Sequence, residues 1–239
     1  MSTDYVYGLH ACNALLKNNR ESILELFVLQ GRHDKRLKTT LNRARGIPIQ
    51  QLSRADLNRM VDSEQHQGIV ARIETKSFSN ENMLPESSLP EFLNNLGKPA
   101  FILVIDGVTD PHNFGACLRT ADAAGVDVVI TPKDKSVGLT PVVRKVACGA
   151  AEVVSICQVT NLARTIEIIQ HEGVWVFGAD GDVDAAIYDM DLKGNVAMVV
   201  GAEGKGMRRL TREKCDHLFQ IPMHGSVSSL NVSVATGIC

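Results

Sequence analysis

The sequence predicts an α/β fold: a mostly parallel sheet in the larger, C-terminal part of the chain, preceded by a small α/β domain. Two observations carry this prediction. Continuous apolar segments alternate with helical patterns after residue 99, and a shorter alternation fills residues 1–76. Strands that are apolar on both faces and separated by helices are typical of a parallel sheet covered on both sides. A polar segment with two prolines, residues 77–98, predicts a linker between domains 1–76 and 99–239.

Within residues 1–76, helical and strand patterns alternate. The segment "YGLHACNALLKNN" predicts a helix, and "ILELFVLQG" predicts a strand that stops at Gly31. A helix rich in Lys and Arg follows in "RHDKRLKTTLNRARG", then a short strand in "IPIQQLS". Ser53 predicts the cap of a helix in "RADLNRMV", and "QGIVARIE" predicts the last strand.

The larger domain begins with an apolar strand and ends with an apolar helix that also carries hydroxyls. Its strands are expected in "AFILVIDG", "VDVVIT", "EVVSICQ", "VWVFGAD", "NVAMVVGAE" and "LFQIP". Helices are expected in "NFGACLRTADAAG" and "NLARTIEIIQHEG". The final helix is expected to begin near Leu230, with Ser226, Ser228 or Ser229 as its cap.

Composition narrows the class of protein. The 239 residues are 44% hydrophobic and 22% charged, as in a soluble globular protein. No apolar run is long enough to span a bilayer and the N-terminus lacks a signal pattern, so we expect a cytoplasmic protein without membrane association. The six cysteines form no C-x-x-C pair and no zinc ligand set, which predicts reduced thiols and no metal.

Charge is unevenly distributed along the chain. Residues 1–76 carry 12 Lys and Arg against 8 Asp and Glu, whereas residues 77–239 carry 13 against 19. The N-terminal domain is therefore the better candidate for contact with a polyanion.

Three loops that leave strands are candidates for the functional site, because ligands of open parallel sheets bind beyond the carboxyl ends of the strands. The first, "DGVTDPHNFGACLRTADAAG", holds Asn113 and Arg119; taken singly, these residues suit a helix cap and a solvated helix face. The second, "VVGAEGKGM", fits neither the phosphate-binding pattern of ATPases nor that of NAD enzymes. The third, "FQIPMHGSVSSLNVSVATGI", lacks the G-x-S-x-G of a serine hydrolase, so a capped, closely packed helix is the simplest interpretation.

Taken together, the three loops resemble the three signature motifs of the SpoU branch of the SPOUT RNA methyltransferases. The segments "YGLHACNALL" and "HQGIVARI" are also similar to the small substrate-binding domain of the bacterial 23S rRNA guanosine-2'-O-methyltransferases. The resemblance therefore covers nearly the whole chain. It implies a deep trefoil knot formed where the C-terminal segment threads through a loop, a homodimer formed through the catalytic domain, and S-adenosylmethionine as cofactor. Members of the family continue past the position of Cys239, so we expect the last helix to be incomplete in this sequence.

The resemblance also implies roles for individual residues. The motif positions assigned to catalysis are Asn113, Arg119, Glu203, Ser229 and Asn231. Those assigned to cofactor contact are Gly201, Gly204, Ile221, Met223 and Leu230. Since arginine holds its proton near neutral pH, we expect Arg119 to orient the hydroxyl or a phosphate and to stabilise negative charge. The basic residues expected to contact RNA phosphates in the N-terminal domain, although each would also suit a solvated helix face, are Arg32, Lys35, Arg36, Lys38, Arg43 and Arg45.

The implied reaction is 2'-O-methylation of a guanosine in 23S rRNA, in the P loop of the peptidyl-transferase centre, with a ribosome assembly intermediate as the partner. Two alternatives stay open: the same chemistry on tRNA, and a noncatalytic RNA-binding protein that keeps the knot. The complete set of motif residues argues against the second alternative, and the basic N-terminal domain favours rRNA over tRNA.

Overall fold

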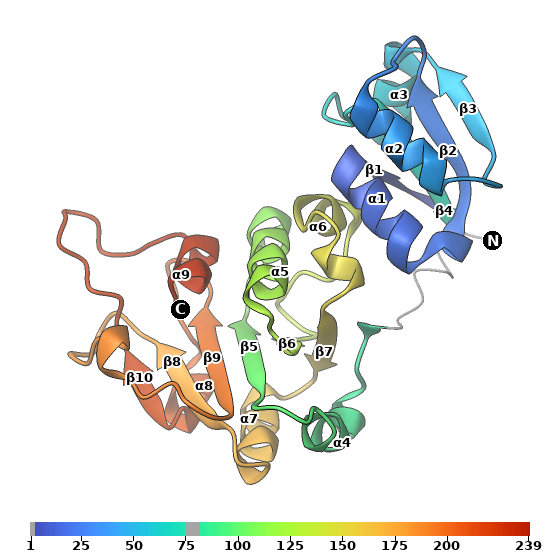
Figure 1. Cartoon of the computed structure of the whole chain (residues 1–239). Coiled ribbons are helices and arrows are strands. Elements are labelled where there is room, and N and C mark those ends of the chain that lie inside the picture. Colours follow the sequence, from blue (N-terminus) through green and yellow to red (C-terminus); the bar gives the residue numbers. More distant parts are fainter. Residues whose placement is uncertain (1–2, 75–81) are drawn as a thin grey trace. The chain divides into compact units, whose positions relative to one another are not determined.

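The chain folds into two compact units (Figure 1). The structure, a computed structural model, describes residues 3–74 and 82–239. Unit 1 comprises Met1–Glu81 with Leu139–Val153, and unit 2 comprises Asn82–Gly138 with Val154–Cys239. Unit 1 is therefore discontinuous, because a segment from the second half of the chain folds with the first. The domain and linker boundaries expected from the sequence stay a prediction.

Unit 1 is built on a four-stranded sheet of order β1-β4-β2-β3, in which β4 is antiparallel to both neighbours and β3 is parallel to β2. Its strands are β1 (Thr3–Tyr7), β2 (Ile23–Leu29), β3 (Ile49–Leu52) and β4 (Ile69–Glu74). Its α-helices are α1 (Leu9–Asn18), α2 (Lys35–Arg43), α3 (Arg54–Val61) and α6 (Pro141–Val146). Every element expected within residues 1–76 is present. Strand β1 was not expected from the sequence, because it is an edge strand of five residues in which apolar positions alternate only briefly with polar ones.

Helices α2 and α3 begin at residues whose side chains cap them, whereas α1 has an apolar stripe but no side-chain cap. Ser53 accepts a hydrogen bond from the backbone N–H of Asp56 at 3.2 Å, which confirms the predicted cap of α3. Asp34 caps α2 in the same way, through the backbone N–H of Leu37 at 3.1 Å. Leu37 is buried in the core, so the basic side chains of α2 lie on its exposed side.

Helix α6 and the turn that follows it were not expected from the sequence. The Lys145 ammonium lies 3.1 Å from the Tyr7 hydroxyl and 4.2 Å from the centre of the Tyr7 ring. At Gly149, a Cβ would overlap the side chain of Ala14 in α1. These contacts attach α6 and its turn to β1 and α1, far away in the sequence.

Unit 2 contains a six-stranded sheet of order β10-β8-β9-β5-β6-β7, in which every pair of neighbours is parallel. Its strands are β5 (Phe101–Asp106), β6 (Val128–Pro132), β7 (Ser155–Val159), β8 (Trp175–Ala179), β9 (Val196–Gly201) and β10 (His217–Phe219). Its α-helices are α4 (Leu89–Asn94), α5 (Pro111–Ala124), α7 (Leu162–His171), α8 (Arg209–Lys214) and α9 (Val232–Ile238). The predicted α/β class with a parallel sheet is confirmed.

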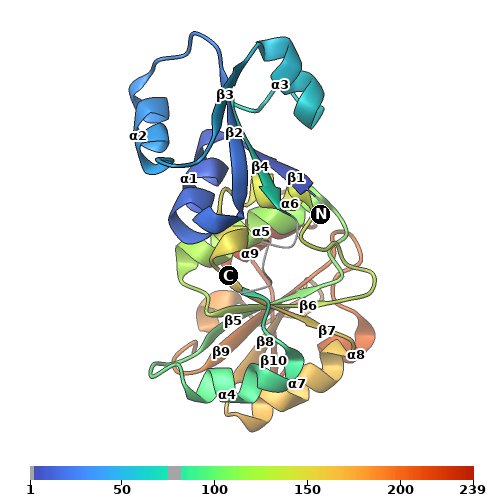
Figure 2. The ribbon, with the colours of Figure 1, turned by 90° about the vertical axis from the view of Figure 1, so that its right-hand side faces the viewer.

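Helices cover both faces of this sheet. Figure 2 shows α5 and α9 on one face and α4 and α7 on the other. On the second face, Ile102 and Val104 of β5 form one core cluster with Leu89 of α4 and Ile166 of α7. Residues 82–98, expected to act as a linker, therefore contribute α4 and the fully buried Leu89 to the core of unit 2.

The C-terminal segment differs from the prediction at two points. Strand β10 ends at Phe219, before the expected stop at Pro222. Helix α9 begins at Val232 rather than near Leu230, and its cap is Asn231, not a serine. The reason is local, since the Asn231 carboxamide oxygen accepts hydrogen bonds from the backbone N–H and the hydroxyl of Ser233, at 3.0 and 2.6 Å.

Candidate active site

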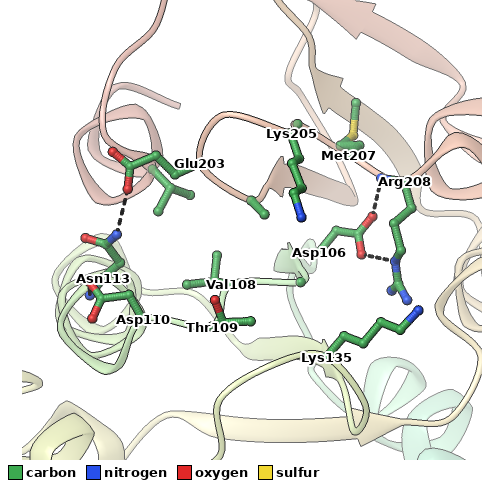
Figure 3. Close-up of a pocket in the computed structure, with 14 residues that line it drawn as sticks. Asp106, Val108, Thr109, Asp110, Asn113, Lys135, Glu203, Lys205, Met207 and Arg208 are labelled. Atoms are coloured by element: carbon green, nitrogen blue, oxygen red, sulfur yellow. Dashed lines mark hydrogen bonds and ion pairs between the residues drawn. The ribbon is translucent and has the colours of Figure 1, made fainter.

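A cavity of about 600 Å³ lies at the carboxyl ends of β5 and β9, where the fold places ligand sites (Figure 3). A volume of this size is ordinary for small-molecule sites. The lining residues come from the first two candidate loops, the loop after β6 and the start of α9. They are Asp106, Gly107, Val108, Thr109, Asp110, Asn113, Lys135, Ala202, Glu203, Lys205, Gly206, Met207, Arg208 and Val232.

Helix α5 begins at the edge of this cavity. Its cap is Asp110, whose carboxylate accepts hydrogen bonds from the backbone N–H groups of His112 and Asn113 at 3.1 and 3.3 Å. Pro111 occupies the first helical position, where the missing N–H costs nothing. The reading of Asn113 as a cap is therefore wrong, and its side chain is available for other contacts.

The glycine-rich loop after β9 folds back on itself. Ala202 and Gly206 exchange backbone hydrogen bonds at 3.1 and 2.8 Å. A Cβ at Gly201 would overlap main-chain atoms of Gly206 and Met207, so this position needs glycine. Gly204 and Gly206 have φ of 73° and 65°, which L-residues rarely adopt. Close approach and positive φ together explain why three glycines surround Glu203.

Asp106 and Arg208 fix the far end of the same loop. The Asp106 carboxylate is fully buried at the end of β5, and it accepts hydrogen bonds from the Arg208 Nε at 2.6 Å and the Arg208 backbone N–H at 2.8 Å. Sequence reasoning missed both residues. The only signal for Asp106 was its position, since a carboxylate that directly follows an apolar strand at its carboxyl end faces the ligand side of the sheet.

A chain of hydrogen bonds joins the three candidate loops. The Asn113 amide nitrogen donates to Glu203 Oε2 at 3.1 Å, and the Asn113 amide oxygen accepts from Asn231 Nδ2 at 3.0 Å. Since Asn231 also caps α9, one residue ties the start of the last helix to α5. The structure thus brings together three of the five residues expected to be catalytic.

Arg119 and Ser229, the other two, lie apart from this chain. Arg119 follows Asn113 by six residues in α5, which places the two side chains on faces of the helix about 120° apart. Arg119 is exposed, and within residues 3–74 and 82–239 its side chain makes no hydrogen bond or ion pair. Ser229 is exposed in the segment before α9. Their catalytic roles stay predictions.

Of the described residues that line the cavity, none is a residue expected to contact the cofactor. Gly201 ends β9 and Gly204 lies in the loop that follows, next to the lining residue Glu203. The remaining three residues lie in the segment of the chain that joins β10 to α9, and their side chains are half-buried. They are Ile221, Met223 and Leu230. Their contact with a cofactor stays a prediction.

The residues expected to contact RNA in unit 1 differ in exposure. Lys35, Arg36 and Lys38 are exposed on α2. Arg43 and Arg45 are also exposed, at and just after the end of that helix. By contrast, Arg32 is partly buried, because it forms an ion pair with Asp34 and donates to the Gln67 carbonyl oxygen.

All six cysteines are free thiols. Burial raises the pKa of Cys117, beside α9, although a hydrogen bond with Thr236 opposes the shift. Burial likewise raises the pKa of Cys239 to about 12. Within the described ranges, 3–74 and 82–239, no group of three metal-ligating side chains occurs and no helix is long and apolar enough to cross a membrane.

Comparison with known proteins defines the class. The sequence model of the SpoU rRNA Methylase family matches residues 100–239, and that for RNA 2'-O ribose methyltransferase substrate binding matches residues 5–79. The fold and the three joined motif loops are thus those of an RNA methyltransferase with a separate substrate-binding domain. The chain belongs to the SpoU rRNA methylase family.

Individual relatives are similar over nearly the full length. The chain is 57% identical to the 23S rRNA (guanosine-2'-O-)-methyltransferase RlmB of Shewanella oneidensis, over 99% of this chain and 94% of that protein. It is 51% identical to the protein of the same name from Escherichia coli, over 99% and 96%. Among solved structures, an RNA 2'-O ribose methyltransferase matches with a TM-score of 0.81 at 23% identity, over 99% of this chain and 85% of that one. The SpoU methyltransferase AviRb from Streptomyces viridochromogenes, in complex with AdoMet, matches with 0.74 at 20% identity, over 99% and 87%.

Proposed function

We propose that this protein transfers a methyl group from S-adenosylmethionine to the 2'-hydroxyl of a guanosine in 23S rRNA. Two observations together support the proposal. Relatives at 51–57% identity over nearly the full length are named for this activity, and the three motif loops meet at one cavity. The alternative of a noncatalytic RNA-binding protein gives no reason for the hydrogen-bonded chain of Asn113, Glu203 and Asn231.

The cavity fits the cofactor. Its volume of about 600 Å³ suits a ligand of this size, and Gly206, which lines the cavity and has open space where a Cβ would lie, lets the backbone approach a ligand closely. The residues that would hold the cofactor are the folded loop, with Gly201 and Gly204, and the half-buried Ile221, Met223 and Leu230. When bound, S-adenosylmethionine supplies an electrophilic methyl group on a sulfonium.

The protein's own residues then act on the ribose. A 2'-hydroxyl is a poor nucleophile near neutral pH, so its developing negative charge needs stabilisation as the proton leaves. Arg119 supplies a permanent positive charge and orients the hydroxyl or its neighbouring phosphate. Ser229 and Asn231 fix the geometry, and the hydrogen bond of Asn231 to Asn113 holds the start of α9 in place.

Unit 1 supplies the RNA-binding surface. The exposed face of α2 carries Lys35, Arg36 and Lys38, and Arg43 and Arg45 follow in the chain. Cationic side chains without a fixed partner bind phosphates with displacement of counterions. Arg32 already holds Asp34 and the Gln67 carbonyl, and Arg43 donates to Asn13 Oδ1 at 3.1 Å. These two residues therefore contribute less to this surface than the other four.

The oligomeric state of the enzyme, its cellular location and its substrate particle are part of the same proposal. The enzyme acts in the cytoplasm as a homodimer formed through unit 2, on a ribosome assembly intermediate, at the P loop of the peptidyl-transferase centre. Two apolar side chains of α9, Val234 and Ile238, are 51% and 41% exposed, which supports burial of this helix against a second copy. The trefoil knot also stays a prediction.

One experiment tests the proposal directly. The protein is incubated with methyl-labelled S-adenosylmethionine and, in separate reactions, with 23S rRNA and total tRNA, and the modified nucleotide is then mapped. Label on the 2'-oxygen of a guanosine in 23S rRNA is expected, and none in the reaction with Arg119→Ala. Label in tRNA alone would assign the activity to the other substrate.

A further inference from the structure

The active-site cavity has one side lined by positive charge. Three of its lining residues are cations: Lys135, from the loop after β6, and Lys205 and Arg208, from the loop after β9. Figure 3 shows the side chains of Lys135 and Arg208 pointing toward one another, with Lys205 directed into the same space and Glu203 and Asn113 across from them. Like charges that converge on a cavity repel one another unless an anion lies between them.

Arg208 is held in a fixed orientation. Its Nε and its backbone N–H both bind the buried carboxylate of Asp106, at 2.6 and 2.8 Å. The two terminal guanidinium nitrogens remain available as donors, and the guanidinium fork suits phosphate oxygens. Asp106 neutralises the charge of Arg208, so the positive potential of this side comes mainly from the two lysines.

The backbone at Lys135 has an uncommon conformation. Its φ is 59°, in the left-handed region that a lysine rarely adopts. The next two residues anchor the loop to the cavity wall, since the Ser136 hydroxyl and the Val137 backbone N–H both donate to the Val108 carbonyl oxygen, at 3.1 and 2.9 Å. A backbone kept in a rarely populated conformation at a ligand cavity is a feature that functional sites share.

Among the described residues, no carboxylate that lines the cavity forms an ion pair with either lysine. Asp110 is engaged in capping α5, Glu203 accepts from Asn113, and Asp106 binds Arg208. Across the part of the chain that the structure describes, the ammonium groups of Lys135 and Lys205 make no ion pair or hydrogen bond. Both are therefore free to bind an anion from outside the protein.

We propose that Lys135, Lys205 and the terminal nitrogens of Arg208 form a subsite for a phosphodiester group of the RNA, next to the nucleotide that is methylated. The proposal rests on the proposed function. A phosphodiester is preferred to the carboxylate of the cofactor because that carboxylate stands beside an ammonium group, which two lysines would repel. A phosphate held in this subsite anchors the backbone of the RNA strand at the cavity that receives its ribose.

Two binding measurements test the subsite. Filter binding of a 23S rRNA transcript, between about 50 and 200 mM KCl, gives the affinity and its salt dependence, and equilibrium dialysis gives the affinity for S-adenosylmethionine. The variant is Lys135→Gln/Lys205→Gln, and the control is Lys133→Gln/Lys193→Gln. The control removes the same charge from positions that do not line this cavity.

Loss of two phosphate contacts lowers the salt slope by about 1.4 to 1.8 and weakens RNA binding about 10-fold. We expect this in the variant only, with unchanged affinity for the cofactor. Equal effects in variant and control, or no effect in either, would overturn the subsite. Weaker binding of S-adenosylmethionine by the variant, with unchanged RNA binding, would also overturn the subsite, because the cations would then bind the carboxylate of the cofactor. A wild-type protein that methylates no 23S rRNA would refute the proposed function without altering either measurement.

Discussion

Asn231 Nδ2 lies 3.0 Å from Asn113 Oδ1, so the first and third candidate loops meet through a single pair of carboxamides. The two residues are 118 positions apart in the sequence. The pair is partly buried, and Asn113 extends the contact to Glu203 of the second loop. The start of α9, and with it the position of the preceding segment, therefore depends on a residue of α5.

The coupling between these asparagines is measurable. Asn113→Ala removes the link, and Asn231→Ala also removes the cap of α9, at a cost of about 1 kcal/mol. In a double-mutant cycle of urea unfolding we expect a coupling energy of about 1 kcal/mol, because each single variant already breaks the shared hydrogen bond. Strictly additive changes in the free energy of unfolding would show that the bond contributes nothing.

Arg119 is expected to need its guanidinium group. Arg119→Lys keeps the charge but loses the planar set of donors, so we expect turnover to fall roughly 100-fold, with RNA and cofactor affinities unchanged. Single-turnover methyl transfer measures the effect. The control is Arg209→Lys, on an exposed helix position that pairs with Glu213. Near-normal turnover of Arg119→Lys would contradict a specific guanidinium role.

The Asp106–Arg208 pair should stabilise unit 2. Asp106→Asn leaves a buried amide in place of a carboxylate that accepts two hydrogen bonds from a cation, and we expect the free energy of unfolding to fall by about 2 kcal/mol. Urea denaturation measures it. The matched change Glu213→Gln breaks an exposed pair and should cost less than about 0.5 kcal/mol. Equal losses in the two variants would show that burial of Asp106 adds nothing.

Unit 1 should lose stability in mild acid because of His66. Burial, followed by the charges of Arg54, Arg32 and Lys145, lowers the pKa of His66 below its ordinary value of 6.5. As the pH falls through 6.5, the unfolded chain binds a proton that the folded chain refuses, so the free energy of unfolding decreases until the lowered pKa is reached. Above that range the contribution is fully present.

Thermal denaturation at about pH 7.5 and about pH 5.5 tests this effect. The drop in melting temperature should be smaller in His66→Gln than in the wild type, whereas His10→Gln, on an exposed face of α1, should behave like the wild type. If His66→Gln kept the full pH dependence, other groups would be responsible.

The sheet of unit 2 was predictable because its strands are continuous apolar runs. In a parallel sheet the carboxyl ends of the strands lie at one edge, so the three loops were expected there for any order of the strands. The cap of α9 was not, because Asn231 stands in a run of polar residues that can all cap a helix. The Asn231 side chain accepts from the Ser233 backbone N–H, and its amide nitrogen also donates to Asn113, 118 positions away. Likewise, nothing near Asp106 in the sequence points to Arg208, 102 residues away.

Because unit 1 is discontinuous in the sequence, the enzyme cannot be divided into its two units by a single cut in the chain. The backbone passes between the units three times, near residues 81, 138 and 153. A fragment cut at residue 81 would lack α6, which contacts β1, and the complementary fragment would carry α6 without its partner. Exchanging RNA specificity between relatives therefore requires transplanting two segments together, 1–81 and 139–153. In evolutionary terms, substitutions in β1 and α6 are expected to have been selected jointly.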